Sequence, residues 1–392
     1  MKRALSLLAL ALALAGCGGS GNTGSDGTGV APPPTDPTVA SGPLTSLGPL
    51  GVAGATLNDT STQVLLNATA ARSAGDLRLG MVTEAEALVA RSADTGIATT
   101  SVAQSIVLGP VTGLDPARGA LQVLGQPVRV DSNTLLEGFE RLDLLAAGDY
   151  VEVFGLRLPG DEGTLATRLI AHRAPQDRAV EVLGVVSDFS AGPPVVSSPG
   201  LRVEPASAPV GIASPAGVQL QPPGISSLQA GAKVRVRGTY DPASNTVTAT
   251  SITTGFETAR PEGRLVYIEG FVLARTSTLY QVGDLYVDTT AIARPLTVGT
   301  RVRLRGVMAA GSLRVDQVTE VAPGERIEYT VAGPVATFGS VSDFVVRGER
   351  IDASMAVFFG GAASELGQGR RIRVKGLAGP GKVRATEVAI LD

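Results

Sequence analysis

The side chain best suited to catalysis is His172, the only histidine among 392 residues. A Ser-His-Asp or Cys-His site would have to be built on it, because both use an imidazole as the base. His172 ends a strand-like run, beside Arg173 and before Pro175. A histidine in that position is ordinarily a surface residue, so we predict no catalytic role for it.

Paired carboxylates are the other groups that could catalyse a reaction, since two of them can cleave a glycosidic bond. The densest pairs are Asp161-Glu162, in a Pro-Gly-Asp-Glu-Gly stretch typical of a solvated turn, and Asp149 with Glu152. A single histidine and a single cysteine cannot supply a zinc-type ligand set. No phosphate loop, dinucleotide fingerprint or calcium loop is present. We therefore predict that the protein is not an enzyme and uses no metal or cofactor, with a carboxylate-based envelope hydrolase as the alternative.

Cations recur at alternate positions in two apolar strand-like segments. One interpretation is an anion-binding stripe for a polyanionic glycan or an acidic partner. The other, which we favour, is a solvated strand face on which each arginine is matched by Glu or Asp on neighbouring strands. The candidate stripe consists of Arg301, Arg303, Arg305, Arg371 and Arg373.

The N-terminus has the order of a secretory signal peptide: two basic residues, an apolar segment and small residues. The apolar segment, Ala4 to Ala15, is shorter than the about 20 residues that span a bilayer. Residues 14–17, Leu-Ala-Gly-Cys, resemble a bacterial lipobox, in which the cysteine is acylated after cleavage. We predict that residues 1–16 are removed and that lipidated Cys17 anchors the protein in the membrane. Gly18 resembles a signal for the outer membrane, facing the periplasm or the cell surface.

Composition limits the class of protein. Cys17 is the only cysteine, so no disulfide can form within the chain. With 49 Gly and 25 Pro, turns should be many and long helices few; the best helical candidate is Leu136–Ala147. Cleavage after residue 16 removes two of 33 basic residues and none of 36 acidic ones, leaving a formal charge of −5. A general nucleic-acid binder would be basic, so a nucleic-acid partner is not expected.

The body of the chain repeats the line Leu-x-x-Gly-x-x-apolar-x-apolar-x-Gly. Alternating apolar residues predict a half-buried strand. The first glycine permits a positive φ where a turn enters the strand, and the second kinks the strand as barrels require. Four copies begin at Leu145, Leu228, Leu296 and Leu366, and a degraded copy begins at Leu77.

The alternation also predicts which side chains point into each core. We expect Val236, Val302 and Val374 inside, and the neighbouring cations outside. Hairpins precede several copies, as at Leu121–Val130. The cations expected outside are Arg235, Arg237, Arg301, Arg303 and Arg373.

These units predict an all-β protein of small closed or nearly closed barrels. Acidic residues outnumber basic ones in the first three units, and the reverse holds in the last two. The expected order is a signal peptide at 1–16, a tether at 17–43, and units at 44–107, 108–178, 179–263, 264–325 and 326–392, the third with a Pro/Gly-rich loop at 187–227.

At this point the residues resemble a family. A lipobox, a Gly/Pro tether and copies of the repeated line look like bacterial lipoproteins with tandem copies of the domain of unknown function 5666. Three first hairpins are also similar to that domain: Val123–Asp131 with Thr134, Val282–Asp288 with Thr290, and Val346–Asp352. The resemblance implies small OB-like barrels. It assigns a role to Cys17 alone.

Together these observations predict a non-catalytic lipoprotein of the cell envelope, a tandem-barrel module for binding or scaffolding. The alternative is a structural spacer that holds a partner off the membrane. The partners expected are the membrane, through the lipid anchor, and an envelope glycan or protein. Linked weak sites would gain avidity from their effective concentration.

Overall fold

The computed structural model describes residues 35–67, 71–160, 162–172, 178–189, 201–204, 210–213, 219–221, 232–244, 246–255 and 258–391. The predicted signal peptide, Cys17 and most of the predicted tether lie outside these residues. Strands dominate the described part, in which the only helical segments are 3-10 turns of three residues. The predicted all-β class is confirmed.

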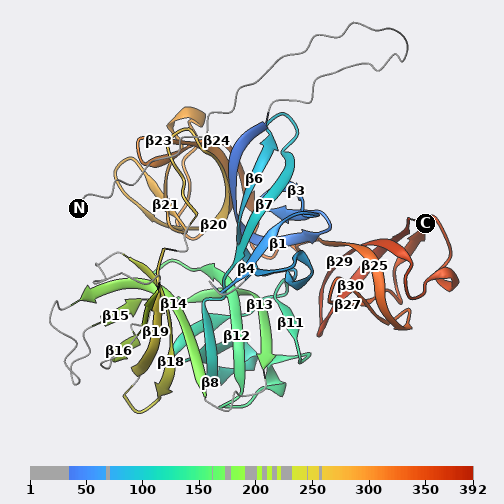
Figure 1. Cartoon of the computed structure of the whole chain (residues 1–392), viewed down its shortest axis with the longest axis horizontal. Coiled ribbons are helices and arrows are strands. Elements are labelled where there is room, and N and C mark those ends of the chain that lie inside the picture. The colour runs from blue at the N-terminus through green and yellow to red at the C-terminus, as the bar shows by residue number, and fades with distance from the viewer. Residues whose placement is uncertain are drawn as a thin grey trace, which may run out of the picture. The chain divides into compact units, whose positions relative to one another are not determined.

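Five small barrels follow one another along the chain (Figure 1). In each one, five strands close a ring in the order first, second, third, fifth, fourth and back to first, as the pairings of barrel 4 illustrate. This ring is the partly parallel Greek-key arrangement of OB-like barrels. The structure thus confirms the expected kind of barrel.

Barrels 1, 4 and 5 belong to one 18-stranded sheet. Barrel 1 comprises β1 (Thr35–Leu47), β2 (Leu50–Val52), β3 (Ala55–Asn58), β4 (Gln63–Leu66), β5 (Ala71–Arg72), the 3-10 turn η1 (Ala74–Asp76), β6 (Val82–Ala90) and β7 (Thr95–Ala103). Barrel 4 comprises β20 (Leu265–Arg275), β21 (Tyr280–Val282), β22 (Leu285–Asp288), η4 (Thr290–Ile292), β23 (Arg301–Ala309) and β24 (Ser312–Val321). Barrel 5 comprises β25 (Tyr329–Ser340), β26 (Asp343–Val346), β27 (Glu349–Asp352), β28 (Val357–Phe359), η5 (Ala363–Glu365), β29 (Arg371–Gly379) and β30 (Lys382–Ile390).

Barrels 2 and 3 form a second sheet of 12 strands. Barrel 2 comprises β8 (Val107–Asp115), η2 (Pro116–Arg118), β9 (Ala120–Val123), β10 (Gln126–Arg129), β11 (Leu135–Glu137), η3 (Leu142–Leu144), β12 (Tyr150–Arg157) and β13 (Thr164–His172). Barrel 3 comprises β14 (Ala179–Phe189), β15 (Leu201–Glu204), β16 (Val210–Ala213), β17 (Gln219–Gln221), β18 (Lys233–Asp241) and β19 (Thr246–Thr253).

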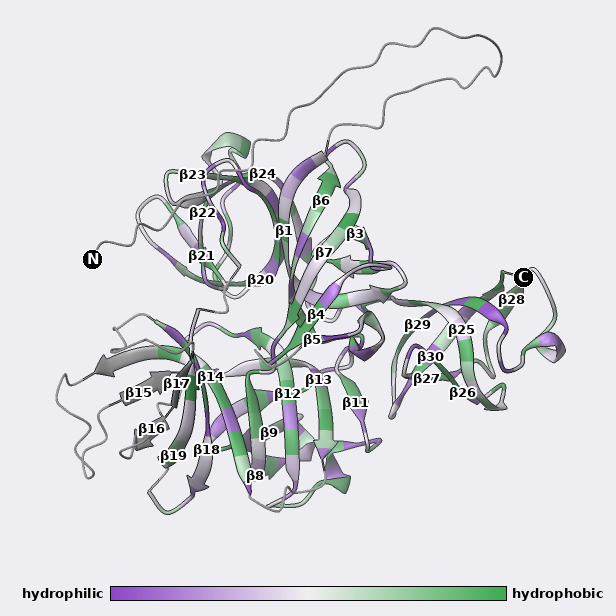
Figure 2. Ribbon diagram, in the orientation of Figure 1, coloured by the Kyte–Doolittle hydropathy of each residue, from purple (hydrophilic) through white to green (hydrophobic). Residues whose placement is uncertain are grey.

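The repeated line folds as its spacing predicts, into the fourth strand of each ring. That strand is β6, β12, β18, β23 or β29 in barrels 1 to 5. Its first glycine has a φ between 75° and 92° in the four barrels where it is described. Its second glycine lies at a register shift of the pairing with the fifth strand, as at Gly306. Val236, Val302 and Val374 are fully buried, as predicted. In Figure 2, β12 carries both polar and apolar residues, and its sequence places Glu152 between Val151 and Val153.

Strand β1 overturns part of the tether prediction. Residues 35–43 are not tether; they form the first strand of barrel 1, paired with β6. The sequence hides this strand for two reasons. Pro37, Gly42 and Pro43 are residues that usually interrupt strands. The buried run Thr38–Ala40 has no alternation, which is the pattern of a strand covered on both faces.

Two other expectations need correction. The segment 187–227 is not simply a loop, because it contains β15, β16 and β17, three short strands of barrel 3. The residues between these strands lie outside the described part of the chain. Its frequent prolines masked these short strands in the sequence. The candidate helix at Leu136–Ala147 contains the end of β11 and only the 3-10 turn η3.

Strand pairing continues from barrel to barrel. β1 pairs in parallel with β20 along residues 38–41 and with β25 at residues 46–47, and β8 pairs with β14. Most buried apolar residues of barrels 1 and 5 form one cluster, which also includes Leu135, Phe154 and Ile170 of barrel 2. Most of those of barrels 2 and 3 form a second cluster, and most of those of barrel 4 a third. The barrels are therefore fused through their strands. No helix within the described residues is long and apolar enough to cross a membrane.

Candidate functional site

Acidic side chains of barrel 1 bind cations of later barrels. Glu84 on β6 accepts a hydrogen bond from Arg260 at 3.0 Å, and Lys233 of barrel 3 lies 3.9 Å away. Arg260 also bonds Asp284 of barrel 4 at 3.0 Å. Although burial raises the pKa of Asp284, Arg260 and Lys233 bring it below its usual value. One cluster of opposite charges thus joins three barrels.

A second acid of barrel 1, Asp94, binds barrel 4. It accepts hydrogen bonds from the Tyr267 hydroxyl at 2.6 Å and from Arg305 at 2.8 Å. Burial, together with the bond to Asp94, raises the pKa of the Tyr267 hydroxyl. Arg305 is also 3.1 Å from Asp316 on the neighbouring strand β24. Asp94 therefore fixes the edge of barrel 4 against the β6–β7 turn.

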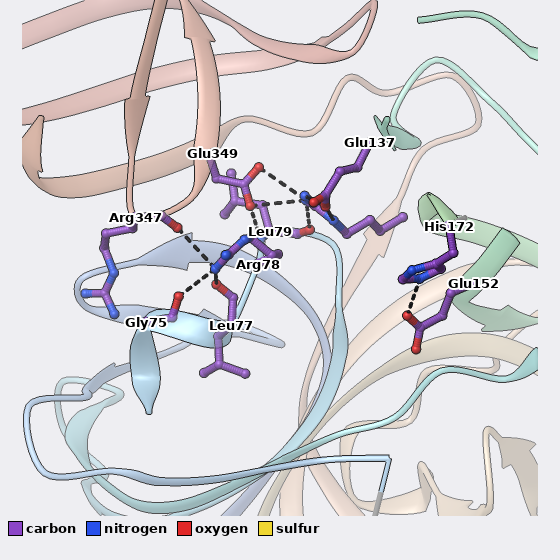
Figure 3. A network of polar contacts seen from close by, with 10 residues as sticks. Gly75, Leu77, Arg78, Leu79, Glu137, Glu152, His172, Arg347 and Glu349 are labelled. Atoms are coloured by element: carbon purple, nitrogen blue, oxygen red, sulfur yellow. Dashed lines mark hydrogen bonds and ion pairs between the residues drawn. The ribbon is translucent and has the colours of Figure 1, made fainter. Parts of the chain in front are cut away.

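A third junction connects barrels 1, 2 and 5 (Figure 3). The guanidinium of Arg168 on β13, whose side chain is 3 % exposed, lies 3.1 Å from Glu349 of barrel 5 and also bonds Glu137. It donates to the carbonyl of Leu79 at 2.9 Å, and the Leu79 amide donates to Glu349 at 2.8 Å. Burial disfavours the charge of Arg168, but Glu349 and Glu137 outweigh it and raise the arginine pKa.

Barrel 5 is held to barrel 1 by a further pair close by. Arg347 donates to Asp59, whose residue is 7 % exposed. Arg78 of barrel 1 donates to the carbonyl of Arg347 at 3.4 Å (Figure 3). In these junctions acids of barrel 1 bind cations of barrels 4 and 5, whereas Arg168 of barrel 2 and Glu349 of barrel 5 pair in the opposite sense.

The predicted anion-binding stripe divides into two parts. Arg301 and Arg303 both bind Glu269, a carboxylate with a fully buried side chain. Arg305 binds the acids named above, whereas Arg371 and Arg373 lie exposed on β29. The structure therefore does not bring the five arginines into one ligand surface, and three of them are matched by acids.

Two cations that we expected outside are buried. Arg235 is 4 % and Arg301 7 % exposed. Each alternates with the buried apolar residues of its strand, as predicted, yet the face on which it lies is not open to solvent. Arg235 donates to the carbonyl of Ser105 and to Glu181, and burial lowers its pKa.

His172 lies at the exposed end of β13, as expected, but it has a partner that the sequence did not reveal. Its Nε2 is 3.0 Å from Glu152 on β12, and this bond raises the pKa of His172. Burial raises the pKa of Glu152, yet bonds from His172 and Asn67 bring it below its usual value. Asn67, which bonds Glu152 at 2.7 Å, comes from barrel 1. Of the predicted carboxylate pair, Asp149 instead accepts from the Ala146 amide in an exposed turn.

The described residues contain no group of three His, Cys, Asp or Glu side chains arranged to hold a metal ion. The Ser105 hydroxyl lies beside the pair of His172 and Glu152, where it bonds Asn67 and Glu152. The polar groups here are arranged to join barrels.

One pair of facing residues recurs in all five barrels, and we call it the entry pair. The residue after a glycine on the first strand faces the residue that enters the repeated strand. The five entry pairs are Pro43–Val82, Pro110–Tyr150, Val185–Lys233, Phe271–Arg301 and Pro334–Arg371.

The entry pair is closed off in three barrels. In barrel 1, Pro43 is buried. In barrel 3, Lys233 lies within 4.0 Å of acids from barrels 1 and 4. In barrel 4, Arg301 is buried on Glu269. The position therefore serves contacts within the molecule in these three copies.

In barrels 2 and 5 the entry pair lines an open groove. The barrel-2 groove encloses about 840 Å³, and its lining includes Tyr150, Arg178 and Tyr240. The Tyr150 residue is 7 % exposed, and its hydroxyl donates to the carbonyl of Arg178 at 3.3 Å. The barrel-5 groove encloses about 710 Å³ and is lined by Arg371 together with the Arg347–Asp59 pair. The sequence did not point to either groove.

Comparisons with known proteins give limited further information. No curated protein matches the chain. Among solved structures, a multidomain protein with nucleic acid binding domains from Streptococcus pneumoniae TIGR4 is similar at 13 % identity and a TM-score of 0.13, over 54 % of this chain and 73 % of that one. A similarity this low supports no argument about function.

The family comparison is specific to barrel 2. Residues 109–169 match the model of a domain of unknown function, DUF5666. This range runs from β8 into β13 and includes the first complete copy of the repeated line. The chain therefore contains a domain of the DUF5666 family, and barrel 2 is that domain.

Proposed function

We propose that this protein is a non-catalytic scaffold and binding module of the cell envelope, held at a membrane by lipid on Cys17. The observation that carries the proposal is the pairing of β1 with strands of three barrels, β6 of its own and β20 and β25 of two others. A strand shared in this way suits a body that keeps its binding faces in fixed positions. It suits an extended spacer less well.

The buried ion pairs support the same function. The charged side chains of Arg168–Glu349 and Arg301–Glu269 are almost completely buried. Such pairs add little net stability over apolar contacts, but losing one partner is costly, about 3–5 kcal/mol. Arg168–Glu349, which joins barrels 2 and 5, therefore favours one arrangement of these barrels over others, whereas Arg301–Glu269 joins two strands within barrel 4.

Fractionation of cells tests the anchor. The mature protein should begin at Cys17 and partition with membranes into detergent, in the outer-membrane fraction if the host has one. Cys17→Ser should block both processing and acylation. If Cys17→Ser were processed and acylated like the wild type, the lipoprotein part of the proposal would fail. Recovery in the inner-membrane fraction would contradict only the outer-membrane assignment.

A further inference from the structure

The barrel-2 groove has the features of a binding site, and its ligand class can be read from its lining. We propose that it binds an acidic oligosaccharide, a chain of sugars that carry carboxylates. This inference rests on the proposed function as a binding module and assigns that module a site and a ligand class. The volume, about 840 Å³, lies within the range of about 300–1,000 Å³ that is common for ligand sites.

Two barrels build the groove together. Pro110, Thr112, Gln122 and Tyr150 come from barrel 2. Tyr240 comes from β18 of barrel 3, and Pro242 from the turn that follows. The pairing of β8 with β14 holds these two barrels edge to edge. Because both sides of the groove belong to one sheet, it is largely formed before any ligand arrives, which lowers the entropic cost of binding.

The apolar part of the groove consists of flat rings. Two of the six tyrosines in the chain lie here with two prolines. Tyr150 is buried and its hydroxyl is bonded to the Arg178 carbonyl, so its ring is fixed, while Tyr240 is half-buried. Burial raises the pKa of Tyr240, with Asp241 adding to the effect, which keeps its hydroxyl protonated. Tyr240 has the more exposed ring of the two, and a tyrosine ring offers contact area at low entropic cost because it has only two side-chain torsions.

The polar part of the groove has groups that suit hydroxyls and one negative charge. Gln122 carries an exposed amide that can both donate and accept. The Thr112 hydroxyl accepts from the Gly125 amide at 3.0 Å and can still donate its own proton. Arg178 is the only charged residue that lines the groove as far as the structure describes it. A ligand with a carboxylate would meet this cation, with Asp241 beside Tyr240 as an acid next to the lining.

A sugar acid combines these requirements. Its ring presents C–H groups to the tyrosine faces, its hydroxyls reach the amide and hydroxyl groups, and its carboxylate pairs with the guanidinium. A nucleic-acid strand fits less well, since binding its phosphates requires several cations. A proline-rich acidic peptide could also lie on aromatic rings, and it becomes an outcome of the test.

The test is calorimetric titration of the full mature protein in detergent. The probes are an α-1,4-linked tetragalacturonate, its carboxyl-reduced uncharged counterpart, and a peptide with the sequence of residues 30–41. The wild type should bind the tetragalacturonate more tightly than the reduced sugar. Tyr240→Ala should weaken both sugars at least about tenfold, the usual effect of removing a central aromatic contact.

Arg178→Asn separates charge from backbone effects. Arg178 has a φ of 48°, and asparagine is one of the few residues that adopt this conformation readily. The variant should weaken the tetragalacturonate about tenfold, one lost charge pair, and leave the reduced sugar within about twofold of wild type. Two matched controls should change nothing: Tyr286→Ala, an exposed tyrosine of barrel 4, and Arg118→Asn, an exposed arginine of barrel 2 outside the groove.

Three outcomes would overturn the inference. One is no heat with either sugar at millimolar concentration, and another is binding that Tyr240→Ala leaves unchanged. The third is binding of the peptide alone, lost in Tyr240→Ala, which would make the groove a peptide site. The proposed scaffold and anchor are tested by fractionation and by exchange in β1, neither of which involves this groove, so the two failures are distinguishable.

Discussion

Barrel 1 is the poorest match to the repeated line, and barrel 5 is one of the best. The two barrels differ in what the outer faces of their strands contact. Barrel 1 supplies the shared strand β1, and its acids Asp59, Glu84 and Asp94 each bind a cation of another barrel. Barrel 5 keeps the full line, and the outer face of its β29 stays exposed at Arg371 and Arg373. The comparison teaches that the outer face of the fourth strand can bind a neighbouring barrel, as at Glu84, or stay exposed, as on β29 of barrel 5.

The largest effect should come from a charge in the shared strand. Val39 is fully buried and faces Glu86 on one side and Val266 on the other. Val39→Asp strands a carboxylate there, at a cost of at least about 4 kcal/mol. Because β1 pairs with β6 of barrel 1 and with β20 of barrel 4, chemical denaturation should show both barrels destabilised together.

The matched variant is Val236→Asp, at an equally buried position of barrel 3 in the other sheet. It should destabilise that barrel and leave barrel 4 unchanged. Equal spread from both variants would remove the special place of β1.

The next effect concerns the second glycine of the line. A Cβ on Gly376 would lie 2.4 Å from the carbonyl oxygen of Arg384, so Gly376→Ala should cost about 3 kcal/mol. Gly367→Ala in the same barrel meets nothing within 4 Å and should cost about 0.5 kcal/mol or less. Barrel 1 has Ala87 at the corresponding register shift, which shows that the shift itself does not demand glycine. Thermal denaturation measures both variants, and equal costs would contradict the steric argument.

A smaller effect separates junction acids from surface acids. Asp94→Asn removes the charge that binds Arg305 and Tyr267 and keeps a side chain that tolerates the φ of 52° at this position. We expect a loss of about 1–2 kcal/mol. Asp343→Asn, in an exposed ion pair with Arg350 of barrel 5, should cost much less, because exposed ion pairs contribute little to stability. Comparable losses in urea denaturation would mean that the junction is no stronger than a surface pair.

The smallest effect is a pH dependence. The folded pKa of His172 is raised, so its bond to Glu152 contributes stability that is complete below the unfolded pKa of about 6.5. This contribution should be lost as pH rises through the folded pKa. Glu152 has a lowered pKa, so its contribution is lost as pH falls below about 4.5. His172→Gln should remove the change near neutral pH in a series of denaturation curves; an unchanged profile would assign that change to another group.

Sequence reasoning predicted correctly the features that depend on the structure of one barrel alone. Spacing alone predicted the repeated strands, their glycines and the buried Val302. It failed for Arg235 and Arg301, because alternation says which face of a strand a side chain occupies and not what covers that face. It failed for β1 because consecutive residues are buried there and the strand contains proline and glycine. Such a strand shows no apolar-polar alternation.

The candidate grooves were beyond the sequence for a related reason. Tyr150 follows the first glycine of the repeated line by two residues, where three other copies carry Lys233, Arg301 or Arg371. The line does not show that Pro110 faces Tyr150. Tyr240 joins it from another barrel through the contact of β8 with β14. Neither proximity follows from local pattern.

Amide hydrogen exchange at single residues in β1 tests the central claim, that barrel 1 is joined to barrel 4 through a shared strand. Successive amides of a strand point to opposite edges, so alternate residues in Thr38–Ser41 face β6 and β20. We predict slow exchange at every one of these amides, comparable to that of the partner residues 265–268. Slow exchange at every second residue, with fast exchange between, would show a free edge and contradict the account.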